Sequence, residues 1–297
     1  MKHDNVIKTT LVIIGISMCI LLPCAAQDLC DKIGYTLTAT TEITGLTGIE
    51  ADLIVPDAPE NTESAPIWGI FPFIEPVMDM NEPRFGILQP VLEWDYNHKT
   101  KQWTITPWYE DGKRAKVCGD EKNQEYCTCT SEQEQLGNPS TTKFYRTDAP
   151  QCHKMCNPKH GQRITASHGD KIRFAITKAG NIWVTTAHNT NTNQQTSFQT
   201  TCIQPQDKLK VGFALENSAG NEIRKDLTQG TIFPGNIVFT NIKFTGNTGT
   251  VQLRPTVDPT AKACFPWLDI HINNALFGIG STETITFITQ PKNKDEM

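Results

Sequence analysis

The densest group of side chains that could do chemistry lies just past the middle of the chain. Cys152, His153, Cys156 and His160 are spaced as the ligands of a tetrahedral zinc site often are. The same cysteines could instead be paired as disulfides. The cellular compartment decides between the two, because oxidation removes the thiolates that a metal requires. The first question is therefore whether the chain is exported.

The beginning of the chain has the three zones of a secretory signal peptide. A basic start precedes an apolar run at 11–22, and small residues follow at 24–26. The run is shorter than the roughly 20 residues that a membrane span requires. We therefore expect residues 1–26 to be removed. The mature chain, 27–297, is expected to be secreted, or periplasmic if bacterial, with no membrane segment.

Export favours disulfides over a metal site. Two of the ten cysteines lie in the predicted leader, and the remaining even number predicts four disulfides whose connectivity stays open. Most of them crowd into a polar stretch with little alternation, so residues 117–165 are predicted to form a cysteine-rich insertion, and neither a metal nor a cofactor is expected. The eight cysteines are Cys30, Cys118, Cys127, Cys129, Cys152, Cys156, Cys202 and Cys264.

Charge and composition exclude some partners. The formal net charge of the 297 residues is −5 at pH 7, and the two signs are well mixed along the chain. There is no basic stripe for nucleic acid and no cationic amphipathic face for a membrane surface. Neither partner is expected, and the oligomeric state stays open.

Alternation of apolar and polar residues dominates the mature chain, and turn residues separate the alternating runs. The runs are rich in Val, Ile, Thr and aromatic residues, which favour strands. No long amphipathic helix is evident. The pattern predicts an all-β, two-sheet antiparallel sandwich or jelly roll, with 189–201 as a loop or exposed hairpin. The clearest runs are 35–39, 171–176, 182–185, 236–244 and 284–289.

Eight short segments also match, in order, the strand motifs of one known family. They include Ile-Leu-Gln at 87–89, Trp-Tyr-Glu at 108–110 and Phe-Ala-Leu-Glu at 213–216. With them, the chain resembles the glutamic endopeptidases, the eqolisin family of secreted acid proteases. The resemblance implies a concanavalin A-like sandwich over nearly the whole mature chain. The other five segments are 51–56, 67–71, 169–172, 238–241 and 268–270.

The resemblance implies that Gln89 and Glu216 are catalytic in an endopeptidase that hydrolyses polypeptides without a covalent intermediate. The glutamate would take a proton from water and return it to the leaving nitrogen, and the glutamine amide would stabilise the oxyanion. The two side chains should then share one face and lie within direct or one-water reach, roughly 2.6–3.2 Å per link. In a strand, Gly212 and Ala214 share the face of Glu216.

Aromatic residues near these motifs are candidates for substrate binding. Trp68, Trp108, Tyr109 and Glu110 could stack on and hydrogen-bond a bound polypeptide, or they could form a buried aromatic patch. Both interpretations stay open from the sequence.

Several positions depart from the family pattern. Phe71 and Thr106 replace acidic residues, Glu93 replaces an aspartate, and the usual propeptide has no room before the first strand. Because of these changes, a second hypothesis for the function stays open: a non-catalytic sandwich module that binds carbohydrate or protein.

Overall fold

Alternate burial along the chain defines the strands of this protein. The computed structural model describes residues 35–58, 68–77, 86–94, 101–111, 159–200, 203, 207–217, 235–246, 251–273 and 283–290. The elements in chain order are β1 (Tyr35–Ile43), β2 (Leu46–Ile54), β3 (Trp68–Pro76), β4 (Gly86–Trp94), β5 (Trp103–Asp111), β6 (Lys159–His160), β7 (Ile164–Ala166), β8 (Lys171–Ala179), β9 (Ile182–Asn189), β10 (Gln194–Thr200), β11 (Leu209–Asn217), β12 (Ile237–Gly246), β13 (Arg254–Val257), α5 (Pro259–Cys264), β14 (Asp269–Asn273) and β15 (Glu283–Ile288).

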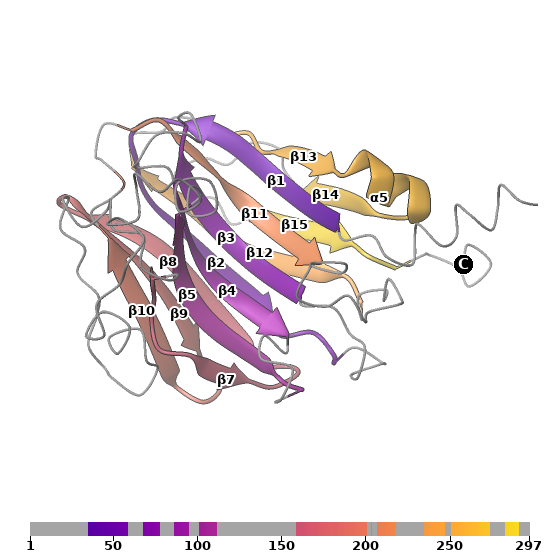
Figure 1. Ribbon diagram of the computed structural model, residues 1–297, viewed down its shortest axis with the longest axis horizontal. Helices are drawn as coiled ribbons and strands as arrows, with labels where there is room; N and C mark the ends of the chain where they lie inside the picture. Colours follow the sequence, from indigo (N-terminus) through magenta and orange to yellow (C-terminus); the bar gives the residue numbers. More distant parts are fainter. Residues whose placement is uncertain are drawn as a thin grey trace, which may run out of the picture.

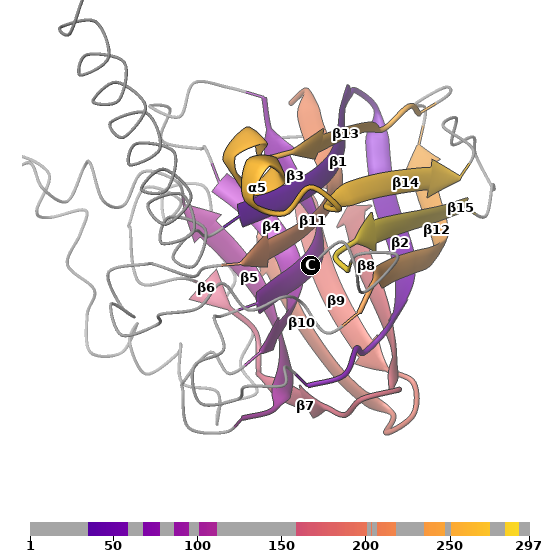
Figure 2. The same ribbon diagram turned by 90° about the vertical axis from the view of Figure 1, so that its right-hand side faces the viewer.

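The strands form two antiparallel sheets packed face to face. Sheet A has the order β13-β1-β11-β3-β4-β5-β6, with β7 also paired to β5, and sheet B has the order β10-β9-β8-β2-β12-β15-β14. Figure 1 looks onto sheet A with sheet B behind it, and Figure 2 shows β3, β4 and β5 on one side and β2, β12 and β15 on the other. The predicted all-β sandwich is confirmed.

The alternating runs of the sequence are strands of these sheets. The runs at 35–39, 171–176, 182–185, 236–244 and 284–289 fall on β1, β8, β9, β12 and β15. The polar stretch at 189–201 forms the hairpin of β9 and β10, and it buries Phe198 in the core.

Aromatic side chains join the two sheets in the core. Phe239 of β12 is fully buried, and its ring centroid lies 4.8 Å from that of Phe213 in β11 of sheet A. The rings of Phe174 and Phe287, both in sheet B, lie 6.5 and 6.1 Å from that of Phe239. Each of β8, β11, β12 and β15 therefore contributes one phenylalanine to this cluster.

The last residues of the predicted insertion are strands of sheet A. Residues 159–160 and 164–166 are strands that pair with β5, and Ile164 is buried in the core. The end of the predicted segment 117–165 therefore belongs to sheet A. The sequence placed the boundary too late because a two-residue and a three-residue strand are too short to show alternation. Residues 117–158 lie outside the described part, as do the predicted leader and seven of the eight cysteines.

Cys264, the last residue of the short helix α5, is disulfide-bonded. The helix begins at Pro259, and the side chain of Asp258 accepts hydrogen bonds from the backbone N–H groups of Thr260 and Ala261 at its start. No helix in the described part of the chain is long and apolar enough to cross a membrane.

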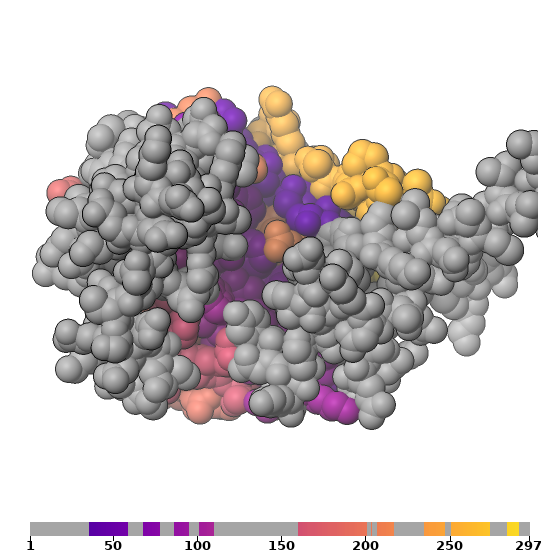
Figure 3. All heavy atoms as spheres, viewed as in Figure 1, coloured from indigo at the N-terminus to yellow at the C-terminus, as the bar shows by residue number. Residues whose placement is uncertain are grey.

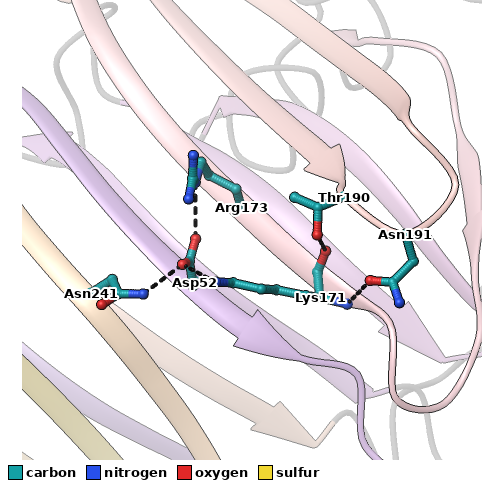
Figure 4. Close-up of polar contacts among 6 residues, drawn as sticks. All are labelled: Asp52, Lys171, Arg173, Thr190, Asn191 and Asn241. Atoms are coloured by element: carbon teal, nitrogen blue, oxygen red, sulfur yellow. Dashed lines mark hydrogen bonds and ion pairs between the residues drawn. The ribbon is translucent and has the colours of Figure 1, made fainter.

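A buried carboxylate clamps three strands on the outer face of sheet B. Asp52 of β2 is 2 % exposed, and its oxygens lie 2.8 Å from Lys171 Nζ, 3.1 Å from Arg173 Nε and 2.7 Å from Asn241 Nδ2 (Figure 4). Asn241 has φ 53° at a shift of register between β12 and its neighbours β2 and β15. Burial alone would raise the pKa of Asp52, but these hydrogen bonds outweigh it and hold the pKa below its ordinary value of 3.8.

Asp52→Ala should lower the free energy of unfolding by about 1–3 kcal/mol at pH 7, because it leaves the Asn241 amide without its acceptor. The difference from wild type should shrink as the pH falls below 3.8, because a carboxylate with a lowered pKa loses its contribution on protonation. Urea denaturation across pH measures this. Asp57→Ala is the control: Asp57 and its partner His168 are both exposed, so less than about 1 kcal/mol is expected. Equal losses in the two variants would contradict a clamping role for Asp52.

Candidate functional site

Sheet A has a second buried surface, on the face turned away from sheet B. We call this the outer face of sheet A; Figure 3 views it, and described atoms of the sheet are visible near its middle. An apolar cluster lies there, separate from the core between the sheets. The burial pattern of β3 and β4 is continuous rather than alternating, because both of their faces are covered. The cluster consists of Phe71, Phe73, Val91, Trp108 and Ala214.

Strand register arranges the outer face in rows that run across the strands. One row contains Gln89 of β4, opposite Trp108 of β5, which in turn is opposite His160 of β6. The row four residues along β4 contains Glu93, opposite Gly69 of β3 on one side and Thr104 of β5 on the other. Glu216 of β11 is opposite Gly69 and so lies in this second row. The row between them contains Ala214, Phe71, Val91 and Thr106.

Glu93 is the most strongly perturbed ionisable group described on this face. Its side chain is buried, and its Oε1 accepts a hydrogen bond from Trp108 Nε1 at 2.5 Å. Its other oxygen, Oε2, accepts no hydrogen bond from any described residue and lies 3.8 Å from Arg163 Nη2. Burial raises the pKa of Glu93 from 4.5 to about 7, although the Arg163 charge and the Trp108 hydrogen bond act in the opposite direction.

Arg163 reaches the outer face from the turn that precedes β7. Its Nε donates a hydrogen bond to Thr106 Oγ1 at 3.1 Å, which holds the guanidinium beside Glu93. The turn is fixed to the edge of the sheet by a hydrogen bond from Gly161 N to Pro107 O at 2.9 Å. No side chain fits at Gly161, because an added Cβ would lie 2.3 Å from Ser197 O. Close backbone packing at Gly161 therefore fixes the position of the backbone from which the Arg163 side chain extends.

Gln89 has an unused acceptor within the apolar cluster. Its side chain is buried, and its Oε1 has no hydrogen-bond partner among the described residues. Trp108 lies opposite, and the ring of His160 packs on Trp108 with centroids 4.9 Å apart. A buried carbonyl oxygen without a partner costs stability. It is also ready to accept a hydrogen bond from a bound molecule.

The register of the strands excludes the direct form of the predicted contact between Gln89 and Glu216. The two residues share the outer face of sheet A. They are separated by β3 and by four residues along the strands, which puts their Cα atoms about 16 Å apart. Two side chains that each reach about 5 Å cannot make a direct hydrogen bond over that distance.

Phe71 lies in the row between the row of Gln89 and the row of Glu216. A Cβ added at Gly69 would be 3.3 Å from Phe71 Cε1 and 3.6 Å from Val91 Cγ1, so the Phe71 ring covers the position between Glu216 and Glu93. This residue replaces an acidic residue of the family pattern. An apolar wall therefore stands where the resemblance implies a further carboxylate.

The predicted substrate-binding residues divide between the two faces of sheet A. Trp108 lies on the outer face, in the buried apolar cluster. Trp68 is fully buried in the core between the sheets, and Tyr109 is buried there too, so neither can contact a substrate and their prediction as binding residues is wrong. Glu110 lies on β5 opposite Ile87, and its side chain is outside the described part.

Sequence reasoning did not select Glu93 or Arg163 as site residues. The signal for Glu93 was present, because it is four residues after Gln89 on the same face and matches an acidic position of the family. Arg163 had no signal, since it lies inside the segment predicted to be an insertion. No cluster of His, Cys, Asp or Glu in the described part could hold a metal. Of the four residues considered as zinc ligands, only His160 is described.

Comparison with known proteins finds similarity of fold. Neither a family model nor a curated protein matches the sequence. Scytalido-glutamic peptidase with a peptide-based transition state analogue matches 86% of this chain and 98% of its own, at 16% identity and a TM-score of 0.48. SCP-B, a member of the eqolisin family of peptidases in complex with the tripeptide Ala-Ile-His, gives the same values, and scytalido-glutamic peptidase with a transition state analogue inhibitor gives a TM-score of 0.49. At such identity, what this chain does has to be judged from its own side chains.

Glu93 should make the stability of the protein depend on pH in a defined window. Between pH 4.5 and about 7 the folded protein keeps a proton on Glu93 that the unfolded chain has released. The free energy of unfolding should therefore fall by up to about 3 kcal/mol as the pH rises through this window, and then level off. Glu93→Gln should remove this component, which denaturation at several pH values measures.

Glu42→Gln is the matched control for this measurement. Glu42 lies on the same sheet, is half-exposed beside Lys208, and has a pKa held below 4.5 by the hydrogen bond and charge of that lysine. It should therefore keep the wild-type slope above pH 4.5. An unchanged slope in Glu93→Gln would show that Glu93 is ionised in the folded protein throughout this range.

Proposed function

We propose that this chain is an exported endopeptidase of the glutamic type, which hydrolyses polypeptides on the outer face of sheet A. The observation that carries the proposal is the pairing of two incompletely bonded polar groups within an apolar surface. These are the carboxamide of Gln89 and the carboxyl group of Glu93, both buried and on one face of β4.

The chemistry of these two groups suits hydrolysis by activated water. A carboxylate can accept a proton from water while the water oxygen attacks the peptide carbonyl carbon, and an amide N–H can stabilise the oxyanion that forms. Both effects are stronger where water is excluded, as the surrounding Phe71, Phe73 and Val91 would ensure. Apolar walls with few polar anchors also suit a bound polypeptide.

The alternative is a non-catalytic module that binds carbohydrate or protein on the same face. The aromatic residues Phe71, Phe73 and Trp108 would serve binding as well as catalysis. The high pKa of Glu93 favours the enzyme, because a module that only binds gains nothing from a carboxyl group poised to exchange protons near pH 7.

Digestion of an unfolded polypeptide in H₂¹⁸O, followed from acid to neutral pH by mass spectrometry, tests the proposal. The wild-type protein should generate peptides whose new carboxyl ends carry ¹⁸O, and chelators should not inhibit it. Gln89→Met, which keeps the size of the side chain but removes the amide, should lower kcat by about 10²–10³-fold.

Thr38→Ala, which changes the outer face on β1 away from the polar pair, is the control and should leave the rate unchanged. Binding of the polypeptide without any cleavage would establish the binding module instead. Full activity of Gln89→Met would place the reaction at another site.

A further inference from the structure

Two carboxyl groups lie in the same row of the outer face, and their surroundings differ. Glu93 is 4 % exposed, whereas Glu216, two strands away, is only partly buried. Between them is Gly69, which has no side chain and is covered by the Phe71 ring. The two groups therefore occupy the same level of the sheet, on opposite sides of an apolar wall.

We infer that Glu93, and not Glu216, is the carboxyl group that exchanges protons with water and the leaving group, and that Trp108 and Arg163 position it. This inference rests on the proposed function. It departs from the family resemblance, which implies that role for Glu216.

Glu93 is on the same strand as Gln89, with only Val91 between them on this face. Their Cα atoms are about 13 Å apart, and side chains that stand roughly perpendicular to the sheet keep their polar ends far enough apart to admit a water molecule and a carbonyl group. Trp108 lies opposite Gln89 in register, yet its indole nitrogen is 2.5 Å from Glu93 Oε1. Its ring therefore runs along the space between the two polar groups and lines one side of it.

The two oxygens of Glu93 have different surroundings. Oε1 is held by Trp108, so the orientation of the carboxyl plane is fixed. Among the described residues, Oε2 has no hydrogen-bond donor, and Arg163 Nη2 lies 3.8 Å from it, which is beyond hydrogen-bond distance. Oε2 is therefore the atom available to take a proton, and Arg163 stabilises the carboxylate without occupying that atom.

The reaction balances with Glu93 alone as the proton carrier. A lone pair of the water oxygen forms the new C–O bond as one water proton passes to Glu93 Oε2, and the carbonyl electrons move to the oxygen. The C=O bond then re-forms, the C–N bond breaks, and the proton on Oε2 passes to the nitrogen. One water is consumed, an acid and an amine are released, and Glu93 is again a carboxylate.

Among the described residues, Arg163, before β7, is the charge that favours the carboxylate of Glu93. Glu216 of β11 lies in the same row, across Gly69. On β5 the nearest groups are Thr104 and Trp108, which are uncharged. His160 of β6 contacts Trp108 and not Glu93. Loss of Arg163 should therefore raise the pH at which Glu93 ionises.

The test is the pH profile of kcat and KM for wild type, Glu93→Gln, Glu216→Gln, Arg163→Met and Arg163→Lys. Glu93→Gln, which can still accept the Trp108 hydrogen bond, should lower kcat by about 10²–10⁴-fold with little change in KM. Glu216→Gln should lower kcat by a smaller factor than Glu93→Gln does. Arg163→Met should move the rising limb of kcat to higher pH, and Arg163→Lys should restore it at least in part.

The indole N–H of Trp108, followed by NMR, gives a second measurement that does not depend on activity. Its chemical shift should titrate with the same midpoint as the rising limb of kcat, and it should be flat in Glu93→Gln. Glu42→Gln should change neither measurement.

The outcomes separate this inference from the proposed function. An active wild-type enzyme in which Glu93→Gln is also active and Glu216→Gln is not would overturn the inference and leave the peptidase standing. A rising limb that does not move in Arg163→Met would overturn the positioning role, even if Glu93→Gln failed to fold. A wild-type protein that binds polypeptide and cleaves none would overturn both.

Discussion

Burial of a carboxyl group on the outer face of sheet A is the constraint on which the candidate site depends. Glu93 can be buried there only because Trp108 donates to one oxygen and a guanidinium stands near the other. The position of Trp108 follows from the register of β4 and β5, and that of Arg163 from the close packing of Gly161 against Ser197 and Pro107. A single carboxyl group thus links β4, β5 and the turn before β7, and a change in any of these would alter its ionisation.

Asp52 and Glu93, two of the three buried carboxyl groups among the described residues, differ in how fully they are hydrogen-bonded. Asp52 on sheet B receives hydrogen bonds from Lys171, Arg173 and Asn241, and its pKa is lowered. Within the described part of the chain, Glu93 on sheet A receives one hydrogen bond, from Trp108, and lies 3.8 Å from Arg163, and its pKa is raised. A carboxylate whose two oxygens both accept hydrogen bonds stays ionised, and it holds the strands together. An incompletely bonded one changes protonation state near neutral pH, which is what a general acid and base requires.

Local alternation was enough to predict the strands, and the family resemblance implied that Gln89 and Glu216 share one face. The same alternation places Trp108 and Tyr109 on opposite faces of the sheet, because neighbouring residues of a strand point to opposite faces. The prediction that all three residues at 108–110 bind substrate did not take this into account. The distance from Gln89 to Glu216 could not be predicted in this way. It depends on the insertion of β3 between β11 and β4, and strand order is set by packing between segments far apart in the chain. Arg163 could not be predicted for a related reason. It lies between β6 and β7, and these strands are too short to show alternation of apolar and polar residues.

The departures from the family pattern change the pH range that the site favours. Phe71 and Thr106 stand where the resemblance implies acidic residues, so the surroundings of Glu93 have lost charge and gained apolar area. A nearby carboxylate and an apolar wall both raise the pKa of a carboxyl group, but only the wall does so by excluding water, and exclusion of water also strengthens the interaction of Gln89 with an oxyanion. A site of this kind has its carboxylate form near pH 7 and above, not in acid. The family resemblance implies an acid protease, whereas the residues on this outer face favour a working range closer to neutral.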